Sequence, residues 1–122
     1  MTAFVPNPLT LVLATPRPGA PRVSVTGDLD YNTAEELLNT AVAALDGGGV
    51  TDLHLDFGGL HFCDSSGLSA LLRIHHHAAA AGARLHLEQR PPVLERLLDV
   101  SGTHEYLTGA AAAAASHSFT QD

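Results

Sequence analysis

Hydrophobic and polar residues alternate in four short stretches of the chain, and this period of two is typical of strands with one buried face. In the third stretch Leu53, Leu55 and Phe57 alternate with polar residues, and the extended pattern ends near Phe62. A run of prolines and glycine between the first two stretches indicates a turn. The predicted strands comprise residues 9–14, 22–27, 51–57 and 84–88.

Three further stretches carry apolar residues at helical spacing. The first begins at Thr33, which has the spacing of a capping box with Glu36. The second follows Asp64, and the third begins at the pair Pro91 and Pro92, because proline is tolerated in the first turn of a helix. Residues 104–108 are interpreted as a short last strand. The three helices end at or near Gly47, Gly82 and Gly102.

The order of these elements predicts a single α/β domain over residues 9–108. The first two strands form an antiparallel hairpin, and each later strand-helix-strand step favours parallel neighbours joined by a right-handed crossover. The expected architecture is a small mixed sheet with helices packed on it. Residues 1–8 are expected to form an N-terminal arm, and residues 109–122, with six consecutive alanines, a tail of frayed helix or disorder.

The turn between the third strand and the second helix contains the most informative polar residues. Either Asp64 or Ser65 can act as the N-cap of the helix by accepting hydrogen bonds from its first amides. With Asp64 as the cap, Cys63 and Leu68 have the positions of a hydrophobic staple. A phosphate on a serine here would meet free amides and the positive end of the helix dipole. The turn is therefore a candidate phosphorylation site, or both serines only cap the helix.

Composition and charge narrow the class of function. The 122 residues carry a formal charge of −7 with only six Lys+Arg, which argues against a nucleic-acid partner because phosphate binding needs clustered cations. No apolar run approaches the roughly 20 residues of a membrane-spanning helix, and the N-terminus lacks the basic residues of a signal peptide. A single cysteine excludes an intrachain disulfide and agrees with a reducing compartment. We expect a cytoplasmic protein that binds another protein, without nucleic-acid or membrane contact.

Other reactive side chains have simpler interpretations. The consecutive histidines His75 to His77 point to different sides of a helix, so they cannot chelate a metal as an i, i+4 pair would; His75, on the apolar stripe, is expected to be partly buried. Cys63 is expected to be a small apolar filler rather than a redox reporter. The serine turn lacks the Gly-x-Ser-x-Gly elbow of a serine hydrolase. We expect no catalytic activity, no metal and no cofactor.

Two segments together carry a family resemblance. The segment from Phe62 to Leu68 (FCDSSGL), with Gly27 to Asp30 (GDLD) upstream, resembles the STAS domain of bacterial anti-sigma factor antagonists over roughly residues 9–107. The resemblance implies a mixed sheet with the helices largely on one side. It also implies that a partner kinase, which is itself the anti-sigma factor, uses ATP to phosphorylate the turn serine. The matching serine is Ser66, directly before the glycine, and Ser65 is the alternative.

The resemblance further implies a partner switch. The unphosphorylated protein would bind the kinase and so release a sigma factor, phosphorylation would end this binding, and a PP2C-type phosphatase would restore it. Asp30 and Asp64 would orient the serine or meet the kinase and its magnesium-bound nucleotide, or Asp30 would form only an Asx turn. Gly67 would leave room for the partner to reach the hydroxyl, or would only lower the helix propensity of this turn. The expected partner-binding residues are Asp28, Asp30, Asp64, Ser65, Ser66, Gly67 and Leu68.

The resemblance also allows a function without a switch. STAS domains serve as scaffold subunits of stress-signalling or lipid-transport complexes, and many of these are never phosphorylated. The retained pair of serine hydroxyls favours the switch, because a scaffold has no need of them.

Overall fold

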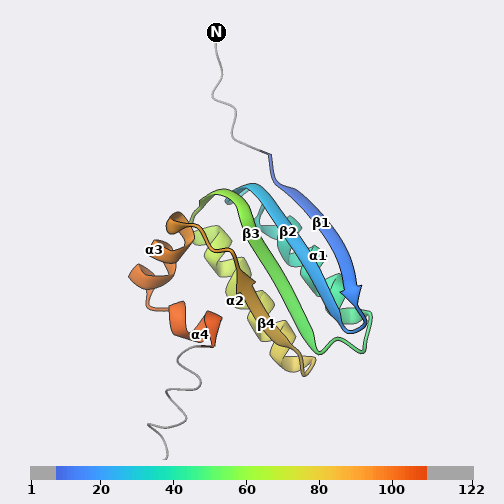
Figure 1. Cartoon of the computed structure of the whole chain (residues 1–122). Coiled ribbons are helices and arrows are strands. Elements are labelled where there is room, and N and C mark those ends of the chain that lie inside the picture. The colour runs from blue at the N-terminus through green and yellow to red at the C-terminus, as the bar shows by residue number, and fades with distance from the viewer. Residues whose placement is uncertain (1–7, 110–122) are drawn as a thin grey trace, which may run out of the picture.

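The computed structural model describes residues 8–109 of the protein (Figure 1). Apart from Pro8 and Gly109, the expected arm and tail lie outside the described residues. Four strands and four helices follow one another along the described part of the chain. They are β1 (Thr10–Arg17), β2 (Ala20–Leu29), α1 (Ala34–Asp46), β3 (Asp52–Cys63), α2 (Ser65–Ala80), β4 (Arg84–Glu88), α3 (Pro92–Ser101) and α4 (His104–Thr108).

The four strands form one sheet in the order β1-β2-β3-β4. β1 and β2 pair antiparallel as a hairpin, whereas the pairs β2–β3 and β3–β4 are parallel. The helices α1 and α2 lie side by side on one face of the sheet, while α3 contacts β3 and α4 contacts β4 (Figure 1). The predicted α/β fold, with a mixed sheet and helices mainly on one side, is therefore confirmed.

The hydrophobic core lies between the sheet and the helices. In β3, Leu53, Leu55 and Phe57 are fully buried while the residues between them are half-buried, as the alternating sequence pattern predicts. Complete burial of each such side chain contributes roughly 1.5–3 kcal/mol. The other large side chains that are fully buried come from β2 and all four helices: Val23, Val25, Leu29, Leu37, Leu71, Ile74, Leu94, Leu98 and Leu107.

The end of the described chain differs from the prediction. Residues 104–108, which were expected to form a short strand, form the helix α4. Gly102 ends α3 in the left-handed conformation at φ 76°, which redirects the chain. α4 then places Leu107, its one buried residue, against β4 and α2. A single buried residue in five cannot distinguish one helical turn from a short strand, because neither period can be read from it.

The start of α1 also differs from the prediction. Thr33 precedes the helix, but its side chain makes no capping hydrogen bond. Its hydroxyl instead donates to the backbone oxygen of Asp28 at 2.8 Å and accepts from the backbone N–H of Asp30 at 2.9 Å. The predicted capping box with Glu36 is therefore wrong. Thr33 ties the end of β2 into the loop that leads to α1.

The face of the sheet away from the helices carries a network of paired charges. Arg22 and His54 both contact the carboxylate of Glu88, at 2.7 and 2.8 Å. The rings of His54 and His86 stack with their centroids 4.7 Å apart, and Nε2 of His86 lies 2.8 Å from Oδ1 of Asp52. The hydrogen bond with His86 is the main reason that the pKa of Asp52 lies below its ordinary value of 3.8. These contacts link β2, β3 and β4 on the side that no described helix covers.

We expect His86→Ala to raise the pKa of Asp52, because the variant removes the hydrogen bond and the nearby positive charge. A carboxylate with a lowered pKa stabilises the fold above its ordinary pKa, and this contribution is lost as the pH falls through the lowered value. NMR titration of the Asp52 carboxyl group measures the shift. The control is His61→Ala, which removes an exposed histidine outside this network. An Asp52 pKa that is the same in both variants would contradict the pairing.

Candidate functional site

The parallel pairing of β2 and β3 brings the two acidic loops of the sequence together. Leu29 and Cys63, the last residues of these strands, are partners in the register. The backbone N–H of Asp64 donates to the backbone oxygen of Leu29 at 3.2 Å, so the chain segments remain bonded beyond the strand pair. Because parallel strands end at the same edge of a sheet, Asp30 and Asp64 lie at one edge, as expected.

Asp64 begins α2. Its Oδ1 accepts hydrogen bonds from the backbone N–H groups of Ser66 at 2.9 Å and Gly67 at 3.1 Å. Of the two candidate N-caps, the structure therefore uses Asp64. Cys63 and Leu68 flank this cap and are both buried in the core, as a hydrophobic staple requires. Because the carboxylate caps the helix, neither serine hydroxyl is needed to begin it.

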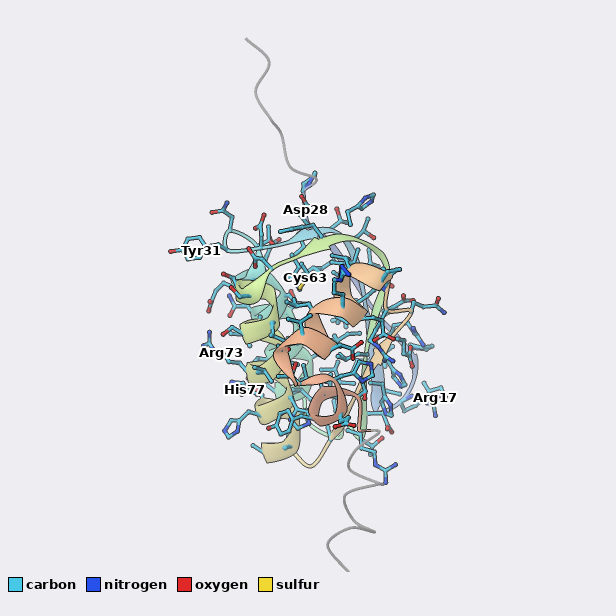
Figure 2. The ribbon with its side chains drawn as sticks, turned by 90° about the vertical axis from the view of Figure 1, so that its left-hand side faces the viewer. Arg17, Asp28, Tyr31, Cys63, Arg73 and His77 are labelled. Carbon is cyan, nitrogen blue, oxygen red and sulfur yellow. The ribbon has the colours of Figure 1, made fainter. Side chains whose placement is uncertain are left out.

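Ser65 and Ser66 line a shallow pocket of about 400 Å³ at the first turns of α1 and α2. Ser65 is exposed and Ser66 is half-buried. Tyr31 forms part of the wall and is 82% exposed. Figure 2 shows Tyr31 and Arg73 on the same side of the molecule. The complete lining consists of Tyr31, Ala34, Glu35, Ser65, Ser66, Ser69, Ala70 and Arg73.

Besides two alanines, the sequence analysis missed four residues of this pocket that carry polar groups: Tyr31, Glu35, Ser69 and Arg73. Arg73 of α2 and Glu35 of α1 form an ion pair, with 3.7 Å between Nη1 and Oε1 and with side chains that are 59% and 68% exposed. The spacing of Ser66, Ser69 and Arg73 (i, i+3, i+7) places them on one side of a helix, and this signal was available in the sequence. Glu35 had no such signal, because only the packing of α1 against α2 brings it to the pocket.

Three of the expected partner-binding residues are buried. Asp28 is 7% exposed and Leu68 is 9% exposed. Gly67 is buried as well, and a Cβ atom there would lie 2.7 Å from Sγ of Cys63 and 3.0 Å from the backbone oxygen of Leu29. Gly67 therefore has a structural role, and the interpretation that it leaves room for a partner stays a prediction. The absence of a side chain lets α2 pack closely against the ends of β2 and β3.

Asp30 is half-buried and has a local structural role. Its Oδ1 accepts hydrogen bonds from the backbone N–H of Asn32 at 2.9 Å and from the hydroxyl of Thr33 at 3.2 Å. This arrangement is the Asx turn that the sequence allowed as an alternative role. Asp30 and Asp64 also place two carboxylates at the edge that carries the serines.

The remaining candidate side chains have structural surroundings. Burial, followed by the charge of Asp64, raises the pKa of the Cys63 thiol to about 12, so this thiol is protonated at neutral pH. His75 is half-buried against the ring of Tyr106, with centroids 4.3 Å apart, and desolvation lowers its pKa. Within residues 8–109, no three His, Cys, Asp or Glu side chains are arranged to hold a metal ion. The helices of this same range are all too short or too polar to cross a membrane.

Comparisons with known proteins identify the family. A family model described as "Mlab, STAS domain" matches residues 13–109, so the chain belongs to the STAS domain family. Its structure is similar to that of the anti-sigma factor antagonist SpoIIAA in its unphosphorylated form, with 25% identity, a TM-score of 0.68 and coverage of 76% of this chain and 81% of that chain. The phosphorylated form of SpoIIAA from Bacillus is similar at 25% identity and a TM-score of 0.64, over 76% of this chain and 84% of that chain.

An anti-sigma factor antagonist from Mycobacterium paratuberculosis has the same fold. It is 23% identical to this chain, with a TM-score of 0.70 over 84% of this chain and 86% of its own. The resemblance to the STAS domain family, inferred from the serine turn and the GDLD segment, is therefore confirmed.

We expect Gly67→Ala to lower the free energy of unfolding by about 1–3 kcal/mol, because the added methyl group must displace backbone or core atoms. Urea denaturation measures the change. Gly47→Ala is the matched control, since Gly47 has an ordinary helical φ of −63° and its nearest neighbour to a new Cβ lies at 3.5 Å. Helix propensity alone favours alanine over glycine by about 1 kcal/mol. Unchanged or increased stability of Gly67→Ala would therefore show that close packing does not require this glycine.

Proposed function

We propose that this STAS domain is an anti-sigma factor antagonist whose binding is switched by phosphorylation of Ser66, with Ser65 as the alternative acceptor. The observation that carries the proposal is the cap of α2. Asp64 accepts the hydrogen bonds that begin the helix, and both serines line an open pocket. The similarity to SpoIIAA, whose structure is known with and without phosphate, adds support at the level of the family.

The first turn of α2 can carry a phosphate without refolding. Ser65 and Ser66 are the first two residues of the helix, where the positive end of the helix dipole favours negative charge. The nearby carboxylate of Asp64 opposes a second negative charge, but it accepts two backbone hydrogen bonds. We therefore expect phosphorylation to change the charge of this surface and to leave the fold intact.

The unphosphorylated surface would bind a serine kinase, together with its ATP, that also acts as the anti-sigma factor, and this binding would release a sigma factor. Tyr31 and Ser65 offer exposed contact area, while Asp30, Asp64 and Ser66 are half-buried beside them. Phosphorylation adds about −1.5 to −2 charges. At an interface that holds ATP phosphates and carboxylates, this charge costs several kcal/mol through repulsion and desolvation. A PP2C-type phosphatase would reverse the change, and the domain itself would catalyse no step.

Intact-mass measurement tests whether the modification occurs. The protein is incubated with ATP and with each candidate serine kinase from the same cell, and fragmentation locates any phosphate. We expect one phosphate on Ser66, lost in Ser66→Ala and retained in Ser69→Ala, which removes another serine of the same pocket. If a kinase that binds the protein adds no phosphate, the switch is refuted in favour of a non-phosphorylated scaffold subunit.

Calorimetric titration with the kinase tests the effect on binding. We expect Ser66→Ala to bind under phosphorylating and non-phosphorylating conditions alike, because it cannot acquire the charge. Ser66→Asp should bind about 100-fold more weakly, equivalent to about 2.7 kcal/mol. Ser69→Asp is the charge-matched control one turn further along the helix. Equal affinities of Ser66→Ala and Ser66→Asp would rule out an electrostatic switch at this position.

A further inference from the structure

The pocket at the serine turn contains one opposite pair of charges. Among its eight lining residues, Arg73 alone is cationic and Glu35 alone is anionic. The chain has only six arginines and no lysine, so cationic side chains are few in this sequence, and Arg73 is one of them. Of the other arginines, Arg22 pairs with carboxylates on the open face of the sheet, and Arg90 pairs with a glutamate of α3. Arg73 is therefore the cationic group available to the candidate phosphorylation site.

The geometry of α2 directs Arg73 toward the serine turn. Arg73 follows Ser66 by seven residues, which is two helical turns and about 10.5 Å along the axis. Side chains on a helix lean toward its N-terminus, so a long arginine side chain extends back along the pocket. Ser69 lies between the two residues in sequence and also lines the pocket. A phosphate on Ser66 lengthens this side chain and so shortens the distance from its end to the guanidinium group of Arg73.

The present partner of Arg73 is weakly held. The ion pair with Glu35 has a distance of 3.7 Å, and more than half of each side chain is exposed. Pairs of this kind are weak because solvent screens them and two long side chains lose freedom. A phosphate group carries about two negative charges and can accept two parallel hydrogen bonds from a guanidinium group. It is therefore the stronger competitor for Arg73.

We propose that Arg73 is the receptor for a phosphate on Ser66, and that phosphorylation exchanges the Arg73–Glu35 ion pair for an Arg73–phosphate pair. The proposal rests on the proposed function for the presence of that phosphate. Arg73 is a positioning residue in this scheme: it holds the phosphate in one place on the surface that meets the kinase. The exchange also leaves the carboxylate of Glu35 without its cation, so part of the added negative charge appears at Glu35, while the net change in charge remains that of the phosphate.

The test uses protein in which phosphoserine is incorporated at position 66 during synthesis, so that no kinase is needed. Titration followed by ³¹P NMR gives the second pKa of the phosphate, which is ordinarily about 6. We expect Arg73→Gln to raise this pKa by about half a unit or more, because the variant removes a cation that favours the dianion. Arg73→Lys keeps the positive charge, so its phosphate pKa should lie between that of the unsubstituted protein and that of Arg73→Gln. The control is Arg96→Gln, which removes an exposed arginine of α3.

The outcomes separate this proposal from the proposed function. Equal phosphate pKa values in Arg73→Gln and Arg96→Gln would overturn the receptor role, even if kinases modify Ser66. A raised pKa in Arg73→Gln alone would support the receptor role, even if no kinase modifies Ser66. A second readout is the Nε–H signal of Arg73, assigned by its loss in Arg73→Gln. We expect this signal to shift when the phosphate is titrated, and an unchanged signal would count against direct contact.

Discussion

The parallel pairing of β2 with β3 is the constraint on which the site depends. Leu29 and Cys63 are register partners, so both strands end at one edge, and the hydrogen bond from Asp64 to Leu29 joins the segments that leave them. Gly67 then allows α2 to begin in close contact with both strand ends. The helix starts directly after the strand, with Asp64 as its cap. The serine turn is therefore held by backbone pairing and close packing, which make it a rigid platform.

Because backbone pairing and close packing hold the serine turn in place, the proposed phosphorylation would act on a partner through the charge of the surface. The proposed phosphate on Ser66 would lie at the positive end of the helix dipole, so we expect the domain to keep its shape. What changes is the set of charges that a partner meets, and the Arg73–Glu35 pair belongs to this set because both residues line the same pocket. Partner choice would then follow from electrostatic complementarity at the edge of the sheet and not from refolding.

The two sides of the sheet use charge differently. On the open face Arg22, His54 and Glu88 are close neighbours across three strands, and the carboxylate of Glu88 is paired with both Arg22 and His54. At the carboxyl edge, by contrast, Asp30 and Asp64 bond mainly to backbone N–H groups and hydroxyls, which leaves their charge without a cationic partner among the contacts described for them.

The sequence determined those features that depend on a few neighbouring residues: the alternation of the strands and the apolar stripes of the helices. For the cap of α2 it left both Asp64 and Ser65 open, and the structure uses Asp64. The sequence misassigned Thr33, whose hydroxyl bonds into the loop before α1 and does not cap the helix. It also could not assign α4, which has one buried side chain. Only the tertiary structure decided which site residues are exposed and brought Glu35 to Arg73, because burial and contacts between helices depend on elements that are distant in sequence.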